Sequence, residues 1–174
     1  MELRELEKKI GYEFKNKELL VKALTHTSYA YENNVESNEK LEFLGDSILE
    51  FISSKYLFEN YKNLSEGEMT KVRAYAVCED NLYKLAIKNN FSDFLFLGKS
   101  EKASKSDKKA ILADSVEAVI AAIYLDSNIS AIVVFPLALL PTNKYKGLFI
   151  YFHSCDYFLQ CTFSRISATR RLTL

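Results

Sequence analysis

The sequence is poor in the residues that interrupt helices or staple small folds, with 5 Gly, 2 Pro and 3 Cys among 174 residues. So few Gly and Pro argue against a loop-rich all-β architecture and favour long helices. The cysteines, Cys78, Cys155 and Cys161, are odd in number and show no C-x-x-C spacing. They therefore argue against a disulfide scaffold and a cysteine-ligated zinc site, and they fit a reducing compartment.

The sequence also lacks an excess of either charge and an apolar run long enough to cross a bilayer. It contains 23 Lys and Arg and 23 Asp and Glu, so generic electrostatic affinity for nucleic acid should be weak. The apolar run at 129–140 is only 12 residues long and contains Pro136, whereas a membrane-spanning helix needs about 20 residues. The charged N-terminus does not resemble a signal peptide. We therefore expect a cytoplasmic protein that has no membrane partner.

The composition changes near residue 129. Residues 1–128 contain 18 Lys and Arg against 22 Asp and Glu, a net charge of −4. Residues 129–174 contain 5 Lys and Arg against 1 Asp, a net charge of +4, together with both prolines and 8 of the aromatic residues. We therefore predict a well-patterned domain at 1–128. The tail at 129–174 is interpreted as an atypical apolar and aromatic segment that is truncated, diverged or out of frame.

Apolar residues of the first 128 positions recur at helical spacing, and no segment shows sustained alternation of period two. The sequence therefore predicts an all-α domain. Ser65 followed by Glu68 is the pattern of a capping box at a helix start. Helices are predicted over residues 3–10, 17–31, 39–60, from 65 onward, 81–88 and 110–125, with polar loops at 31–38 and 98–109.

The helix at 39–60 is predicted to bury one apolar side in the core. We expect that side to consist of Leu41, Leu44, Ile48, Phe51, Ile52 and Leu57.

Five carboxylates on two of these helices are spaced so that each set shares one side of its helix. Glu39, Glu42 and Asp46 follow an i, i+3, i+7 pattern, and Asp114 and Glu117 lie three residues apart in an otherwise apolar helix. Unpaired burial of Asp114 and Glu117 would cost several kcal/mol for each, so a cation should offset them. Mg²⁺ prefers carboxylate oxygens, water and substrate phosphate. Two such ions about 4 Å apart suit in-line displacement at phosphorus.

Each of these patterns also has an ordinary structural explanation. An acidic stripe is commonly a solvated helix face, and Asp114 and Glu117 could be buried partners of Lys or Arg. The Ser65 motif could serve only as a cap. His26 fits a hydrogen-bonded histidine better than a ligand, and Cys78 fits a packed thiol better than a nucleophile.

Four stretches of the chain resemble the ribonuclease III family of double-stranded-RNA endonucleases, in order and in spacing. The most specific match is NEKLEFLGDSIL at residues 38–49, which resembles the family signature. The others are ALTHTSY at 23–29, LSEGEMTKVRA at 64–74, and ILADSVEAVI at 111–120 with YLDS at 124–127. The resemblance covers about residues 3–128.

This resemblance implies an all-helical endonuclease domain that forms a homodimer around a valley for duplex RNA. It implies Mg²⁺, for which Mn²⁺ can substitute, and hydrolysis of phosphodiester bonds to 5′-phosphate and 3′-hydroxyl ends in the processing of rRNA and mRNA precursors. By motif position, Asp46 and Glu117 would be catalytic and would bind metal together with Glu42 and Asp114. Glu39 and Glu66 would be supporting acidic residues, and Phe43 would enter the partner subunit at the dimer interface; ordinary core packing is its alternative.

The chain departs from the family pattern in two places. The loop before the last catalytic helix is less rich in Gly but is basic, and its lysines are candidates for phosphate contacts or for a solvated loop. These are Lys99, Lys102, Lys105, Lys108 and Lys109. After residue 128 the pattern of a double-stranded-RNA-binding domain is not recognisable, so RNA affinity should be weak and salt-dependent.

Three other readings stay open at the level of sequence. One is a non-catalytic ribonuclease-III-like protein that binds RNA or a ribonucleoprotein, and another is an inactive truncated remnant. The third is a carboxylate-bridged di-metal oxidase, which would require Glu-x-x-His pairs. Neither His26 nor His153 has Glu three residues before it.

Overall fold

The computed structural model describes residues 3–104 and 108–127. The described residues form α-helices and one short 3₁₀ helix, with no strand beyond an isolated parallel bridge between Thr25 and Phe96. The predicted all-α class is therefore confirmed. The elements are α1 (Leu3–Ile10), α2 (Lys17–Ala23), α3 (Thr27–Asn33), α4 (Glu39–Asn60), α5 (Glu66–Ala76), α6 (Glu79–Lys88), η1 (Phe91–Asp93), α7 (Lys99–Ala103) and α8 (Lys109–Ser127).

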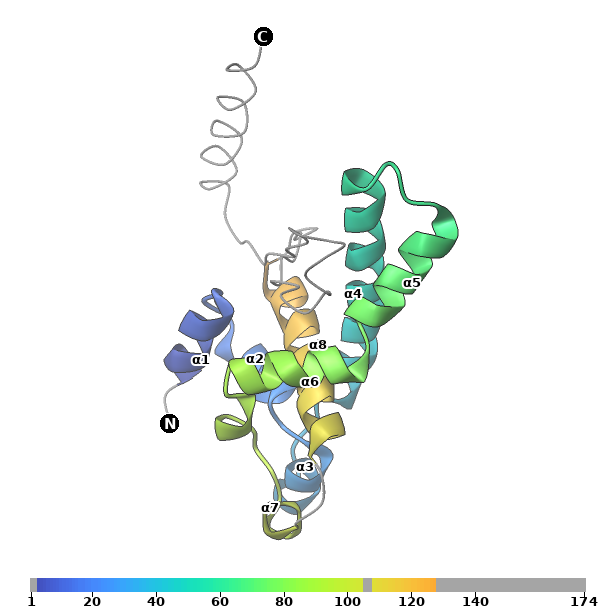
Figure 1. Ribbon diagram of the computed structural model, residues 1–174. Coiled ribbons are helices and arrows are strands. Elements are labelled where there is room, and N and C mark those ends of the chain that lie inside the picture. The colour runs from blue at the N-terminus through green and yellow to red at the C-terminus, as the bar shows by residue number, and fades with distance from the viewer. Residues whose placement is uncertain (1–2, 105–107, 128–174) are drawn as a thin grey trace.

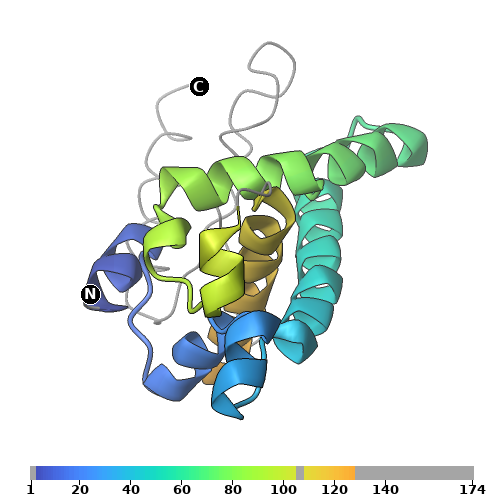
Figure 2. The ribbon, with the colours of Figure 1, turned by 90° about the horizontal axis from the view of Figure 1, so that it is seen from below.

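Helix α8 forms the centre of the fold, and α2, α4 and α6 pack around it (Figures 1 and 2). Its sequence is almost entirely apolar, so it buries nearly every side. Val116, Val119 and Ile120 are fully buried, as is the small polar Ser115, whose hydroxyl donates to the Leu112 carbonyl at 2.7 Å. A helix buried on nearly every side gives its few charged side chains a fixed position.

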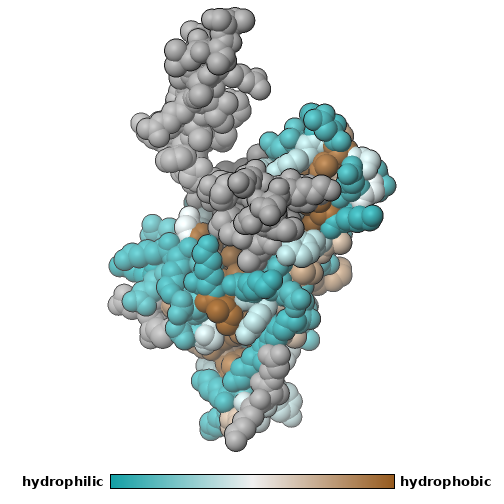
Figure 3. Space-filling model, in the orientation of Figure 1, coloured by the Kyte–Doolittle hydropathy of each residue, from teal (hydrophilic) through white to brown (hydrophobic). Residues whose placement is uncertain are grey.

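The C-terminal half of α4 and all of α5 extend from this core as an arm in both ribbon views (Figures 1 and 2). A small separate cluster, in which Leu57 and Val72 are buried, holds the two helices together. Apolar side chains show through the surface of this arm in Figure 3. The predicted capping box at Ser65 and Glu68 is present at the start of α5.

The C-terminal end of α8 fixes the segment that joins α1 to α2. The buried Asp126 carboxylate accepts the Tyr12 hydroxyl at 2.7 Å, the Lys15 amide at 2.8 Å and the Asn16 amide at 2.7 Å. A carboxylate that accepts three donors is well compensated for its burial. These hydrogen bonds join the segment between α1 and α2 to the C-terminal end of α8.

The sequence predictions hold for the long helices and miss three local features. The predicted helix at 17–31 is divided at 24–26, because Thr25 forms the bridge to Phe96 and His26 caps a new helix. The predicted loop at 98–109 contains α7. Phe51, predicted to lie in the core, is 67% exposed. The predicted tail at 129–174 lies outside the described residues. Within the described residues, none of the helices has the length and apolarity that crossing a membrane requires.

Candidate metal centre

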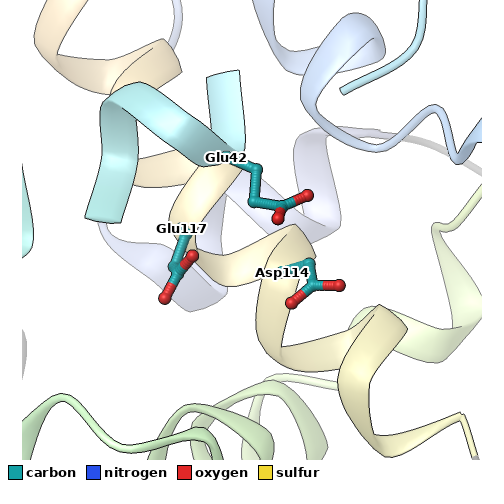
Figure 4. Close-up of side chains that lie close together, drawn as sticks. All are labelled: Glu42, Asp114 and Glu117. Carbon is teal, nitrogen blue, oxygen red and sulfur yellow. The ribbon is translucent and has the colours of Figure 1, made fainter. Parts of the chain in front are cut away.

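Carboxylates from α4 and α8 converge at one place in the fold. Glu42 lies in the first turns of α4, while Asp114 and Glu117 lie one turn apart on α8 (Figure 4). Each of the three offers a carboxylate oxygen, and these oxygens lie within 4.8 Å of one another. All three residues are half-buried. One member of the predicted acidic set on α4 therefore meets both members of the set on α8.

Gly45 allows this convergence. A Cβ at this position would lie 1.9 Å from the main-chain oxygen of Glu117, so α4 and α8 touch backbone to backbone here. No side chain fits in that space. The glycine lies three residues after Glu42, and the contact therefore sets the separation of the two helices at the level of the acidic cluster.

The cluster disfavours full ionisation in the absence of a cation. Burial, followed by the charges of Asp46, Asp114 and Glu42, raises the pKa of Glu117 to about 8. Burial and then Asp114, Glu39 and Asp46 raise the pKa of Glu42. Half-buried like charges repel strongly because little water screens them.

Asp114 is also affected by two residues outside the predicted set. Burial raises the pKa of its carboxyl, the charge of Glu79 raises it further, and His26 lowers it. Glu79 is the first residue of α6, and only the three-dimensional packing of α6 on α8 brings it near. His26 itself is hydrogen-bonded as expected, with Nδ1 at 2.8 Å from the Ser28 hydroxyl.

The donor set fits a hard divalent cation. It consists of carboxylate oxygens alone, which are the protein ligands that Mg²⁺ prefers. None of the ion pairs formed within residues 3–104 and 108–127 includes Glu42, Asp114 or Glu117. The alternative that Asp114 and Glu117 are buried partners of Lys or Arg is thus not what the described residues show.

Two of the other predicted acidic residues border the centre. Asp46 follows Glu42 by one turn on α4 and is exposed. Among the neighbouring charges, that of Asp46 contributes most to the raised pKa of Glu117. Glu39 is exposed one turn before Glu42 and accepts a hydrogen bond from the Ser37 hydroxyl at 2.8 Å.

Glu66 is not brought to the centre within the chain. It begins α5, and it lines a hollow of about 240 Å³ together with Leu57, Phe58 and Met69 at the far end of α4. Leu57 lies 15 residues after Glu42 on one helix, which corresponds to roughly 22 Å at 1.5 Å per residue. Glu66 therefore lines a hollow at the end of α4 opposite to the one that carries Glu42.

The predicted lysines differ in their surroundings. Lys99 and Lys102 are exposed on α7, and Lys108 is half-buried. Lys109 is half-buried and forms ion pairs with Glu79 at 3.3 Å and with Asp80. Lys105 lies outside the described residues.

An aromatic stripe, defined as Phe43, Phe51 and Phe58, runs along the outer side of α4. These side chains are 78%, 67% and 68% exposed. Their spacing of eight and seven residues keeps them on one side of the helix. Among the residues that the structure describes, Phe43 is therefore not packed in the core, which is the ordinary alternative.

Comparison with known proteins shows the family to which the chain belongs. The model of a family described as ribonuclease-III-like matches residues 16–140. The chain belongs to the ribonuclease III family. It is 51% identical over 130 residues to Ribonuclease 3 of Caldanaerobacter subterraneus subsp. tengcongensis, covering 73% of this chain and 57% of that relative. It is 50% identical over 129 residues to Ribonuclease 3 of Clostridium perfringens, covering 73% and 54%.

Solved structures support the same family. The nuclease domain of ribonuclease III from Campylobacter jejuni superposes with a TM-score of 0.66 and 39% identity, covering 72% of this chain and 86% of that one. That structure is described as showing flexibility in a region involved in dimer formation. The present chain spans just over half the length of the ribonuclease III relatives that it matches.

Proposed function

We propose that this ribonuclease III family member is an Mg²⁺-dependent endoribonuclease that hydrolyses duplex RNA to 5′-phosphate and 3′-hydroxyl ends. The observation that carries the proposal is the meeting of Glu42, Asp114 and Glu117 within 4.8 Å, on α4 and α8, which carry two of the four stretches that resemble the ribonuclease III family. We assign the domain at 1–128 to this activity, in the cytoplasm, on rRNA and mRNA precursors.

In this proposal Glu42, Asp46, Asp114 and Glu117 hold the metal, which is Mg²⁺ or, as a substitute, Mn²⁺. A divalent ion bound there supplies an activated water and offsets charge on the phosphate. We assign the catalytic role to Asp46 and Glu117 because they occupy the most restrictive positions of the two motifs that resemble the family. Gly45 keeps α4 against the Glu117 backbone, so the ligands from the two helices keep a fixed separation.

The domain is a weak electrostatic partner for RNA by itself. Residues 1–128 carry a net charge of −4, so cleavage should depend strongly on salt and on Mg²⁺. We propose that the duplex is recognised through its phosphates and sugar hydroxyls, without base sequence.

We further propose a homodimer formed through the aromatic stripe. Phe43, Phe51 and Phe58 are exposed over the length of α4, and Phe51 lies near the middle. Two such helices packed antiparallel around Phe51 would place Phe43 beside Phe58 of the partner subunit. The hollow of about 240 Å³ that Phe58 lines can receive this ring.

The same arrangement would give Glu66 a role. Glu66 lines that hollow, so in an antiparallel pair it would approach the acidic centre of the partner subunit. Each centre would then combine Glu39 with Glu66 of the partner subunit as supporting acidic residues.

The test is cleavage of a long duplex RNA by the purified chain, with Mg²⁺ or with a chelator. We expect short duplex products with Mg²⁺ and intact RNA with chelator. Glu117→Gln should reduce cleavage by roughly three orders of magnitude or more and spare RNA binding. Glu18→Gln, which changes an exposed carboxylate on α2, is the control and should cleave normally. Intact RNA with the unmodified chain and Mg²⁺, or full activity of the Glu117 variant, would refute the proposal.

A further inference from the structure

A row of hydrogen bonds, made by main-chain and side-chain acceptors, attaches α7 and the segment before it to α3 and the segment that enters α3. The Phe96 amide donates to the Leu24 carbonyl at 2.9 Å, and the His26 amide donates to the Phe96 carbonyl at 3.1 Å. The Gly98 amide then donates to the Ser28 hydroxyl at 2.9 Å. The backbone before α7 is thus fixed along the backbone that enters α3.

Glu32 of α3 makes the last contact of this row. Its two carboxylate oxygens accept the Lys99 amide at 2.9 and 3.1 Å, at the first residue of α7. The carboxylate also lies against Gly98, because a Cβ there would be 2.7 Å from the Glu32 Oε1 and 2.8 Å from the Ser28 carbonyl oxygen. Glu32 therefore occupies the position of an N-terminal cap, but it comes from another helix.

A cap from outside is important for so short an element. Helix α7 spans 5 residues, Lys99–Ala103, and no side chain of its own N-cap residue can help, since that residue is Gly98. A helix of this length is unstable alone in water. Its position on the protein therefore depends on the contacts that α3 supplies.

The α7 segment lies at the end of the molecule where α4 and α8 begin (Figures 1 and 2). The Ser28 hydroxyl that accepts the Gly98 amide also contacts His26 Nδ1 at 2.8 Å. The charge of His26 in turn lowers the pKa of the Asp114 carboxyl. The residues that hold α7 therefore include Ser28, whose neighbour His26 acts on Asp114 of the acidic centre.

We propose that Glu32 is a positioning residue for RNA: it holds α7 so that the exposed Lys99 and Lys102 contact the phosphate backbone of the duplex beside the acidic centre. This inference rests on the proposed endoribonuclease function. Glu32 touches neither the RNA nor the metal, and it acts through the orientation of the two lysines.

The direction in which RNA affinity changes in Glu32→Ala distinguishes a positioning role from a purely electrostatic one. Replacing a carboxylate by a neutral side chain makes the protein more positive, which strengthens attraction to RNA. If Glu32 acted only through its charge, Glu32→Ala would bind duplex RNA more tightly. A positioning role gives the opposite result, because a detached α7 no longer presents its lysines.

The experiment compares Glu32→Ala, Glu32→Gln and Glu18→Ala in the full chain. The Glu18 variant is the control because it removes the same charge from an exposed position in the first turn of α2. We expect Glu32→Ala to raise KM for duplex RNA at least about threefold with kcat unchanged. We also expect it to lower the salt slope of binding by about 1 for each lost phosphate contact. Glu32→Gln, which keeps an acceptor oxygen, should recover part of the affinity.

Two readouts make the outcome decisive. RNA binding is measured in Ca²⁺, and cleavage is measured in Mg²⁺. A wild-type chain that binds RNA but does not cleave it refutes the proposed function. The binding measurement still tests the role of Glu32 in that case. Amide hydrogen exchange of residues 98–103 should accelerate in Glu32→Ala, with α4 and α8 unchanged. Unaltered or tighter RNA binding by Glu32→Ala, or equal effects of Glu32→Ala and Glu18→Ala, would overturn the inference.

Discussion

The α carbon of Gly45 lies so close to Glu117 that an added methyl group would be 1.9 Å from its carbonyl oxygen. Gly45→Ala should therefore force α4 and α8 apart and displace Glu42 from the α8 carboxylates. We expect a loss of stability of about 1–3 kcal/mol and a larger loss of cleavage. Urea unfolding and a duplex cleavage assay measure the two effects.

Gly67 provides the matched control for that substitution. It lies in the first turn of α5, where an added Cβ would meet nothing within 4 Å. Gly67→Ala should leave cleavage intact and stabilise the protein by up to about 1 kcal/mol. Equal behaviour of the two alanine variants would contradict the role given to Gly45.

The metal-free protein should lose stability as pH rises. In the folded chain the pKa of Glu117 is about 8 against an ordinary 4.5, so between these values the folded state binds more protons than the unfolded state. By linkage, the free energy of unfolding then falls with rising pH. Mg²⁺ should reverse this trend, since the cation replaces the proton and its stabilising effect should grow with pH.

Denaturant unfolding from pH 5 to pH 8, with and without Mg²⁺, measures this dependence. Glu117→Gln carries no titrating group at this position, so its stability in chelator should fall less steeply with pH. Parallel pH curves for the variant and the wild type would show that the half-buried Glu117 does not titrate as described.

The aromatic stripe on α4 should control the oligomeric state. Phe43→Ala is expected to weaken the dimer by about 2 kcal/mol, the cost typical of an aromatic residue that is buried in an interface pocket. Tyr31 on α3 is 91% exposed and lies off α4, so Tyr31→Ala should dimerise normally. Sedimentation velocity over a range of concentrations separates these outcomes, and a wild-type chain that stays monomeric would exclude the interface.

Asp126 should be important for stability, although it lies away from the acidic centre. Asp126→Ala leaves three donors without their acceptor, from Tyr12, Lys15 and Asn16. We expect a loss of roughly 2–4 kcal/mol. Asp93→Ala, at an exposed position in η1, should change stability by less than about 0.5 kcal/mol. Thermal unfolding of both variants compares them, and equal melting temperatures would refute this role.

The long helices were predictable because their periodicity and caps are local properties of the sequence. Helix α4 has the predicted bounds, and the Ser65 capping box is present. The division of residues 17–31 was not predictable, because Thr25 pairs with Phe96 far along the chain. Helix α7 was missed for a similar reason, since its cap comes from Glu32 on another helix.

The meeting of carboxylates from α4 and α8 could be expected from the sequence, but the surroundings of the cluster could not. The carboxylates of α4 and α8 could be recognised from spacing and motif, and three of them meet as expected. Phe51 was assigned to the core because periodicity cannot separate a side that packs inward from one that faces another subunit. The influence of Glu79 on Asp114 depends on how α6 packs, which no local pattern reveals.

The central position of α8 has a consequence for biosynthesis. Helices α2, α4 and α6 all leave the ribosome before the helix on which they pack. Until α8 has emerged, the apolar sides of these helices cannot be buried against it, so they stay exposed and prone to incorrect association. Folding of this domain should therefore occur late and in one step, once residues 109–127 have cleared the exit tunnel.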